Sequence, residues 1–310
     1  MSSQHDHYLA RMHLAGFSFD GKRLWQLDRR NNTLHEVGVR DAGVKRRLNT
    51  VKRNGVVDRS LERYIAAVNE SPAGPLVAKL RKAPAGPIDL TSDERGTMAE
   101  YVALTYARSP AWRGQTPQRT NAAIAAMARR YEDPADFARQ VASAGIRMDA
   151  LAVEVTRLRY LVAFRRGEIP AGLEIDPWPI TVKTAIEGRG RDVLASMTTF
   201  AIRREREPFM VCGDSAVLLM KDGAYFGHGQ LGVGGPDVRV VTPISSEAFL
   251  VSTFVGGADV AQLLAHWQSD DFAAFVNRAS FEHAIRFVFA RESAQLERAS
   301  ADHAANRLAS

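Results

Sequence analysis

A chain of 310 residues with 45% hydrophobic and 25% charged residues has the length and composition of a globular protein of one large domain or two modest ones. No apolar run reaches the roughly 18–20 residues that span a bilayer, and the N-terminus carries charges and histidines where a signal peptide would be apolar. The single cysteine, Cys212, excludes an intramolecular disulfide and a cysteine-based zinc cluster. We therefore expect a cytoplasmic protein.

The net charge of +6 is divided unevenly along the chain. Residues 1–166 hold 28 Lys and Arg against 17 Asp and Glu, whereas residues 167–310 hold 13 against 18. The basic half either binds a polyanion or is the solvated surface of an arginine-rich protein. The candidate phosphate contacts are the run from Arg40 to Arg53, which includes Arg46 and Arg47, and a helix with Arg157, Arg159, Arg165 and Arg166.

The first half of the chain predicts a β-hairpin followed by helices. Residues 22–28 and 33–39 alternate in polarity around a turn of asparagines, which favours a hairpin. From Asp58 onward the apolar residues repeat at helical spacing. Thr91 and Glu94 form a capping box, and the helix that they start must end before Pro110. Further helices are predicted over residues 120–131, 134–144 and 148–164.

The second half predicts a sheet followed by helices. Prolines and glycines crowd residues 170–179, which is the best candidate boundary, and a helix is expected over 180–197. Short apolar runs then predict an antiparallel sheet, with strands over residues 198–202, 209–212, 216–220, 238–243 and 249–254. Apolar residues at helical spacing continue from Val260 to Phe289 and predict helices.

This order of elements is typical of the α+β class and not of a βαβ alternation. We expect a single α+β domain over residues 1–300, built on a central antiparallel sheet with a large helical insertion and C-terminal helices. The N-terminal hairpin should join the sheet of residues 198–254, because an isolated hairpin is marginal in water. The expected parts are an N-terminal segment and hairpin (1–56), the helical insertion (57–167), the sheet and C-terminal helices (168–300) and a frayed tail (301–310).

Six short segments, taken in order, resemble a mainly bacterial family that is catalogued as domain of unknown function 4238. They are His7-Tyr8 with Leu14 and Phe17-Ser18, Leu61-Glu62, Leu90–Arg95 with Arg108-Ser109-Pro110, Phe209–Asp214, Pro243-Ile244-Ser245, and Asn277 with Arg286. The chain departs from the pattern at Ala10, where the family has proline, and at Ser215-Ala216, where it has Asn-Pro. The resemblance implies no activity.

Four of the matched residues are candidate catalytic groups. His7 and Asp214 are the acid–base candidates, Arg108 would hold an anion, and Asn277 would orient a substrate or leaving group. Each also has a structural interpretation. His7 and Asp214 can hydrogen-bond backbone groups, and Arg108 can complement a helix dipole or pair with an acid if it is buried. If they are catalytic, the four side chains should share one pocket at an edge of the sheet.

Three further features have plainer interpretations. Arg286 is a candidate binding residue, although Glu282 four residues earlier offers it a surface ion pair. The glycine-dense segment 227–235 is interpreted as a hairpin loop, since it lacks the lysine and the following helix of a phosphate loop. Cys212 lies in an apolar strand and is interpreted as a buried small side chain. No spacing typical of metal ligands occurs, so no metal site is predicted.

Two classes of function follow from these observations. The first is a hydrolase that acts on nucleic acid or a nucleotide, at a phosphate-ester or glycosidic bond. The second is a non-catalytic binding or regulatory protein with a basic polyanion-binding face. In both cases the expected partner is nucleic acid or a nucleotide and no membrane, and the sequence predicts neither a cofactor nor an oligomeric state.

Overall fold

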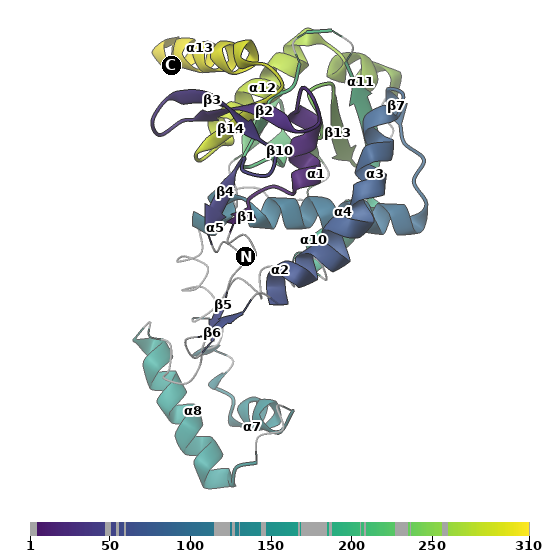
Figure 1. The fold of residues 1–310 in the computed structure, drawn as a ribbon. Helices are drawn as coiled ribbons and strands as arrows, with labels where there is room; N and C mark the ends of the chain where they lie inside the picture. Colours follow the sequence, from purple (N-terminus) through teal and green to yellow (C-terminus); the bar gives the residue numbers. More distant parts are fainter. Residues whose placement is uncertain are drawn as a thin grey trace. The chain divides into compact units, whose positions relative to one another are not determined.

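The computed structural model divides the chain into two compact units (Figure 1). Unit 1 comprises residues 1–113 and 179–310, and unit 2 comprises residues 114–178. The segment expected as a helical insertion thus contributes its first helices to unit 1 and its last to unit 2. The structure describes residues 5–46, 51–53, 56–58, 60–114, 125, 128–129, 131–143, 147–166, 168, 185, 188–204, 206–207, 209–226, 235, 237–255 and 260–309.

A six-stranded antiparallel sheet forms the centre of unit 1. Its order is β11-β10-β12-β13-β8-β7. Both faces of the sheet are buried, so that in β13 Phe249 and Val251 enter one core while Leu250 enters the other. The strands are β7 (Gly86–Pro87), β8 (Thr198–Arg203), β10 (Leu218–Lys221), β11 (Ala224–Phe226), β12 (Arg239–Pro243) and β13 (Ala248–Thr253).

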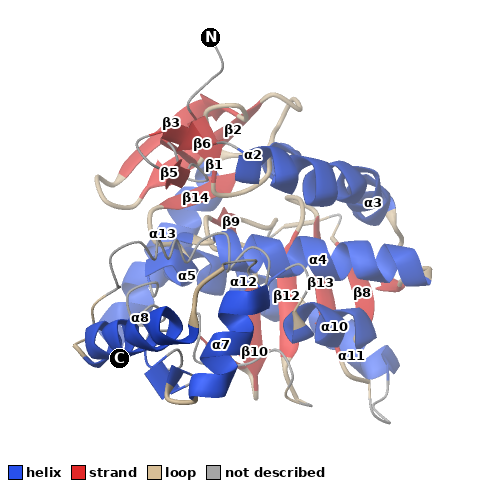
Figure 2. Ribbon diagram, turned by 90° about the horizontal axis from the view of Figure 1, so that it is seen from below, coloured by secondary structure: helices blue, strands red, loops and turns tan. Residues whose placement is uncertain are grey.

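Three helices cover one face of this sheet: α3 (Ser71–Lys82), α4 (Ser92–Arg108) and α10 (Arg189–Ser196). Figure 2 shows α4 and α10 in front of strands β8, β12 and β13. The predicted capping box starts α4: the Thr91 side chain accepts from the Glu94 N–H, and the Glu94 carboxylate accepts from the Thr91 N–H. The helix ends at Arg108, as the proline at 110 requires.

The other face of the sheet packs against three groups of elements. The first is the short helix α1 (Arg11–Leu14) near the N-terminus, together with the 3₁₀ segment Ala15–Phe17 that follows it. The second is the helix pair α11 (Val260–Trp267) and α12 (Asp270–His283). The third is a second, four-stranded sheet. The core between them is aromatic and includes Phe17, Phe200 and Trp267, all of which are almost completely buried.

The four-stranded sheet has the order β3-β2-β14-β9. It contains the predicted hairpin, β2 (Arg23–Asp28) and β3 (Thr33–Gly38), together with β9 (Cys212–Gly213) and β14 (Phe287–Ala290). The α+β class is confirmed, with most of the described strands divided between two antiparallel sheets instead of one. The hairpin pairs with β14, which in turn pairs with β9 at residues 212–213. The other strands of residues 198–254 form the six-stranded sheet, so the hairpin does not join them as expected.

Strand β14 corrects the sequence analysis, which expected helix through Phe289. All four residues of β14 are buried, because β2 and β9 flank the strand and α13 (Ser293–Ala309) packs near it. A strand that is apolar on both faces shows no alternation, so its pattern resembles that of a buried helix.

Shorter elements complete unit 1. Strand β1 (His5–His7) pairs with β4 (Val44–Arg46), and β5 (Val51–Arg53) pairs with β6 (Val56–Asp58). Helix α2 (Ser60–Ile65) continues through a π-helical turn, Ala66–Glu70, into α3, and α5 (Pro110–Gly114) follows α4. The predicted helix over 120–131 and the glycine-dense segment lie largely outside the described residues.

Unit 2 is built around helices α7 (Pro134–Ser143) and α8 (Ala150–Arg165). Its core contains Tyr131, Phe137, Leu161 and Phe164. Asp149 caps α8 by accepting from the Ala152 N–H at 2.7 Å. Among the helices of the described ranges, none combines the length and apolar character that a bilayer crossing requires.

Candidate functional site

Asp214 is completely buried just after β9, and its carboxylate binds backbone. Oδ1 accepts from the Ile285 N–H at 2.9 Å, and Oδ2 accepts from the N–H groups of Arg286 and Phe287 at 2.9 and 3.0 Å. Burial raises the pKa of Asp214 to about 6, although these backbone hydrogen bonds act to lower it. The carboxylate therefore fixes the turn between α12 and β14.

Asn277, on α12, also holds backbone. Its Oδ1 accepts from the Val211 N–H at 2.9 Å, and its Nδ2 donates to the Phe209 carbonyl at 2.8 Å. The structure thus brings Asp214 and Asn277 to the same short segment, residues 209–214, which they attach to α12 and β14. In this arrangement both side chains serve the structural interpretation that the sequence also offered.

Arg108 points inward from the last turn of α4 and is almost completely buried. Its Nη1 lies 2.5 Å from Oε1 of Glu70, which ends the π-helical turn before α3. The buried guanidinium therefore has the acidic partner that the sequence analysis required of it. This ion pair joins α4 to the start of α3.

The candidate binding arginines are placed differently. Arg286 lies beyond the end of α12 and pairs with Asp28 on β2, with Nη2 at 2.8 Å, so its partner is not the expected Glu282. In unit 2, the buried Arg157 binds the Glu154 carboxylate and donates to the Tyr131 carbonyl at 2.8 Å, which leaves it no solvent-facing guanidinium for a phosphate. Arg47 and the side chains of His7 and Arg46 lie outside the described residues.

A buried polar chain that sequence reasoning missed crosses the core of unit 1. His13 Nδ1 lies 2.6 Å from the Tyr101 hydroxyl, and His13 Nε2 lies 3.6 Å from the Cys212 thiol. Arg81 donates to the carbonyls of Met12 and His13 at 2.6 and 3.2 Å. The three side chains come from α1, α4 and β9, so the chain connects the helical layer to the four-stranded sheet.

This cluster of hydrogen-bonded side chains has the residue types of a nucleophile and a base. The pKa values of its groups, however, are not those that catalysis requires. Burial, with the nearby positive charge of Arg81, lowers the pKa of His13 to about 3, so the imidazole is neutral. Burial raises the pKa of the Cys212 thiol well above its ordinary value and keeps it protonated. A reactive cysteine needs a lowered pKa and access to substrate, so the chain is structural.

The accessible candidate is a basic groove at the end of β8. It has a volume of about 650 Å³, within the usual range for ligand sites. Lys82 ends α3, Arg203 ends β8, and Gln268 joins α11 to α12, so three separate segments form the groove. We call it the Lys82–Arg206 groove; its lining residues are Lys82, Pro84, Ala85, Arg203, Arg204, Arg206 and Gln268.

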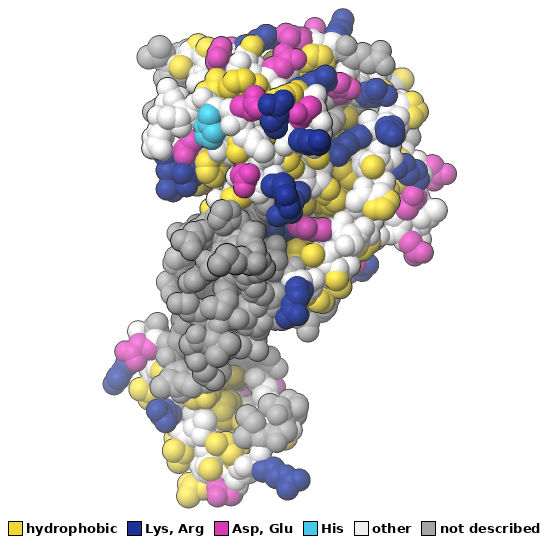
Figure 3. All heavy atoms as spheres, in the orientation of Figure 1, with side chains coloured by type: hydrophobic (Ala, Val, Ile, Leu, Met, Phe, Trp, Pro, Cys, Tyr) yellow, Lys and Arg dark blue, Asp and Glu magenta, His cyan; other side chains and the backbone are white. Residues whose placement is uncertain are grey.

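One of the four cations of the groove is buried, and the other three are exposed or half-exposed. Arg204 is buried, donates to the carbonyls of Gln268 and Ser269, and pairs with Asp270. Arg206 is 75% exposed and lies 3.5 Å from the same Asp270. Lys82 is exposed, and within the described residues it has no acidic partner. Figure 3 shows Lys and Arg side chains gathered on the face where α3 and β7 lie in Figure 1.

The acids among the described residues at the groove do not balance these cations. Glu247 is shared between Arg203, at 4.0 Å, and Arg291, at 3.0 Å. Asp270 is shared between Arg204 and Arg206. Positive charge is therefore in excess on a concave and accessible surface, which attracts anions. Among the described residues, no group of three His, Cys, Asp or Glu side chains is placed to hold a metal ion.

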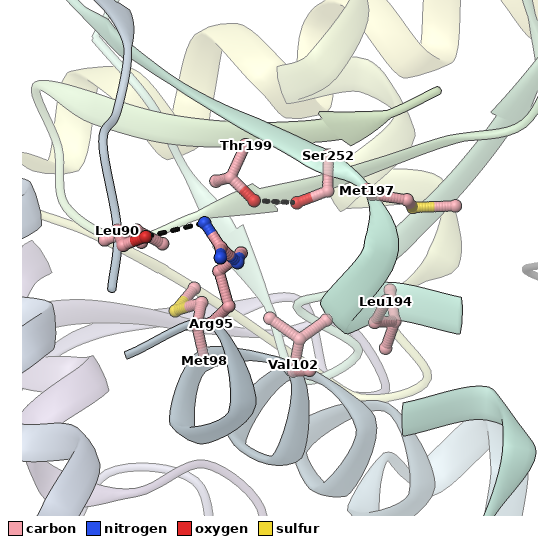
Figure 4. Close-up of a pocket in the computed structure, with 9 residues that line it drawn as sticks. Leu90, Arg95, Met98, Val102, Leu194, Met197, Thr199 and Ser252 are labelled. Carbon is pink, nitrogen blue, oxygen red and sulfur yellow. Dashed lines mark hydrogen bonds between the residues drawn. The ribbon is translucent and has the colours of Figure 1, made fainter. Parts of the chain in front are cut away.

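A second cavity, between α4, α10 and the sheet, is too small for a ligand. Its volume is about 10 Å³, close to what a single water needs. Figure 4 shows Arg95 directed to the Leu90 carbonyl, at 2.7 Å, and the hydroxyls of Thr199 and Ser252 paired at 3.0 Å. These polar groups satisfy one another, so the cavity is a packing feature.

The fold and these sites define an α+β protein with a buried polar cluster in its core and a basic groove on its surface. Comparison with protein families adds the identity: the chain belongs to the family described as Protein of unknown function (DUF4238), whose model matches residues 5–294. The resemblance that the sequence motifs suggested is therefore confirmed. No curated protein and no solved structure matches the chain.

Proposed function

We propose that this protein binds the phosphate backbone of nucleic acid through the Lys82–Arg206 groove. The observation that carries the proposal is the convergence of four cations, Lys82 from the end of α3 and three arginines from residues 203–206, on one open concave surface. Among the described residues, two shared acids, Glu247 and Asp270, offset them. Lys and Arg side chains at such a surface bind phosphates by charge and release counterions from the nucleic acid.

The residue types in the groove favour phosphate contacts over recognition of bases. Among the described residues, no aromatic side chain lines the groove, and stacking on aromatic rings is how proteins hold unpaired bases. Arg203 and Arg206 present planar guanidinium groups that match phosphate oxygens, and Lys82 adds a point charge. Binding should therefore depend weakly on sequence and strongly on salt.

A hydrolase is less well supported by the described residues. Asp214 and Asn277 would be its acid–base and orienting groups, yet both are bonded to backbone. The binding or regulatory interpretation needs neither residue as a catalyst. The groove offers it a basic surface, which differs from the predicted one because three of its four cations lie in the second half of the chain.

The double variant Lys82→Glu/Arg206→Glu tests this proposal. We expect it to weaken binding of a fluorescein-labelled 20-nucleotide DNA by about tenfold or more in low salt, because two attractive side chains become repulsive toward phosphate. The dependence of log Kd on log salt concentration should also become shallower, by about 0.7 for each phosphate of the single strand that the variant leaves without a cation. Fluorescence anisotropy at several salt concentrations measures both quantities.

Lys22→Glu/Arg189→Glu is the matched control, because both residues are exposed, neither lines the groove, and the net charge changes by the same four units. It should leave the affinity within about twofold, since charges more than a Debye length from the bound DNA are largely screened. Equal losses of affinity in the control and the double variant would show that net charge alone attracts the DNA. No binding of single- or double-stranded DNA or RNA by the unmodified protein at low salt would refute the proposal.

A further inference from the structure

Helix α8 in unit 2 carries apolar side chains on two opposite faces. Leu161 and Phe164 point into the core of unit 2 and are almost completely buried. On the other face, four aliphatic side chains form an exposed stripe; Leu151 is 75% exposed, Val155 56%, Leu158 48% and Val162 49%. Figure 3 shows apolar side chains on the surface of this unit. Such a stripe on one helix indicates a partner.

The spacing of the stripe identifies the kind of partner. Its members follow one another at four, three and four residues. This is the heptad spacing of a coiled coil, with valines at the a positions and leucines at the d positions. β-branched residues at a with leucine at d favour two parallel strands. Arg165 occupies the next d position and ends the seam.

The charges beside the stripe are complementary between two parallel copies. Glu154 falls at a g position and Arg159 at the following e position, five residues later. In a parallel pair these two positions face each other across the seam. The Glu154 carboxylate binds Arg157 in its own chain but stays 42% exposed, and Arg159 is exposed without an acidic partner among the described residues.

We infer that the exposed stripe of α8 is a homodimer interface, in which the α8 helices of two copies of this chain pack in parallel. A second copy fits better than a membrane, because the stripe is a narrow seam flanked by charges of both signs and not a wide apolar face edged with cations. The seam covers about two heptads, so the association should be weak and concentration-dependent. The inference does not depend on the Lys82–Arg206 groove.

The first test measures the mass of the full chain by sedimentation over a range of concentrations. We expect a monomer–dimer equilibrium that Leu158→Glu weakens by at least about tenfold, because it places a charge in the seam. Arg159→Glu, an exposed change that leaves the fold intact, should also weaken it, since Glu154 of the partner is then repelled. Ala150→Glu is the control: Ala150 is exposed on α8 but lies outside the stripe, and the dimer should persist.

The second test fixes the orientation by oxidative cross-linking of variants that each gain one cysteine on the stripe. If the helices are parallel, two molecules of Leu151→Cys should form a disulfide with each other, and so should two molecules of Val162→Cys. When the two variants are mixed, few disulfides should join position 151 of one molecule to position 162 of another. The native Cys212 is buried and gives a low background. A chain that is monomeric at all concentrations, a dimer unaffected by Leu158→Glu, or a preference for the mixed 151–162 disulfide would each overturn the inference.

Discussion

Replacing His13 by glutamine is expected to change the way in which stability depends on pH. In the folded protein His13 has a pKa of about 3, against its ordinary value of 6.5, because burial beside Arg81 disfavours the imidazolium. As the pH falls below 6.5, the unfolded chain binds a proton that the folded chain does not. The free energy of unfolding therefore falls by about 1.4 kcal/mol per pH unit, and by roughly 5 kcal/mol in total between pH 6.5 and 3.

Asp214 acts in the opposite direction over part of this range. Its folded pKa of about 6 lies above its ordinary value of 3.8, so its protonation adds stability as the pH falls from 6 to about 4. Between pH 6 and about 4, the contributions of His13 and Asp214 to the slope of unfolding free energy against pH therefore nearly cancel in the unmodified protein. The difference in unfolding free energy between this protein and the His13→Gln variant isolates the histidine contribution.

Urea unfolding followed by tryptophan fluorescence at pH 4 to 7.5 measures this difference, since the buried Trp267 belongs to the same core as the residues around His13. The advantage of the unmodified protein over His13→Gln should shrink steadily below pH 6.5. The control His35→Gln, at an exposed position of β3, should keep the pH dependence of the unmodified protein. If the unfolding free energies of His13→Gln and the unmodified protein changed with pH in the same way, the His13 imidazole would not be held neutral in the folded protein.

The elements that the sequence predicted correctly are those with a local signal. The hairpin of β2 and β3 shows alternation around an asparagine turn, and Asn32 adopts a positive φ of 51° there. The capping box of α4 is contained in four residues. Strand β14 lacks such a signal, because its environment is set by β2, near the other end of the chain, and by β9.

The candidate sites depend on contacts that spacing does not encode. His13, Tyr101 and Cys212 are up to 199 residues apart, and only the packing of α1 between α4 and β9 brings them together. The groove has one local signal, the run Arg203-Arg204-Glu205-Arg206, but Lys82 and Gln268 lie at the ends of unrelated elements, so their approach to this run is not encoded by spacing. Heptad spacing in α8 is present in the sequence, but the second apolar face of the helix hides it in a simple periodicity count.

Asp214→Asn is expected to destabilise the protein by about 2–4 kcal/mol. Three backbone N–H groups converge on the two carboxylate oxygens, and an asparagine offers only one acceptor oxygen. In its best orientation the amide oxygen accepts from Arg286 and Phe287, while the NH₂ group faces the Ile285 N–H. That donor is then left unpaired in a site closed to water, and two donors face each other.

Thermal or urea unfolding of this variant beside Asp222→Asn gives the comparison. Asp222 carries the same chemical change at an exposed turn with a φ of 52°, a conformation that asparagine adopts readily. We expect the control to stay within about 0.5 kcal/mol of the unmodified protein. If Asp214→Asn were as stable as the control, the carboxylate would not be needed to hold residues 285–287 and would be free for chemistry, which would restore Asp214 as a catalytic candidate. A large loss of stability instead makes Asp214 the residue that fixes the turn on which β14, and with it the four-stranded sheet, depends.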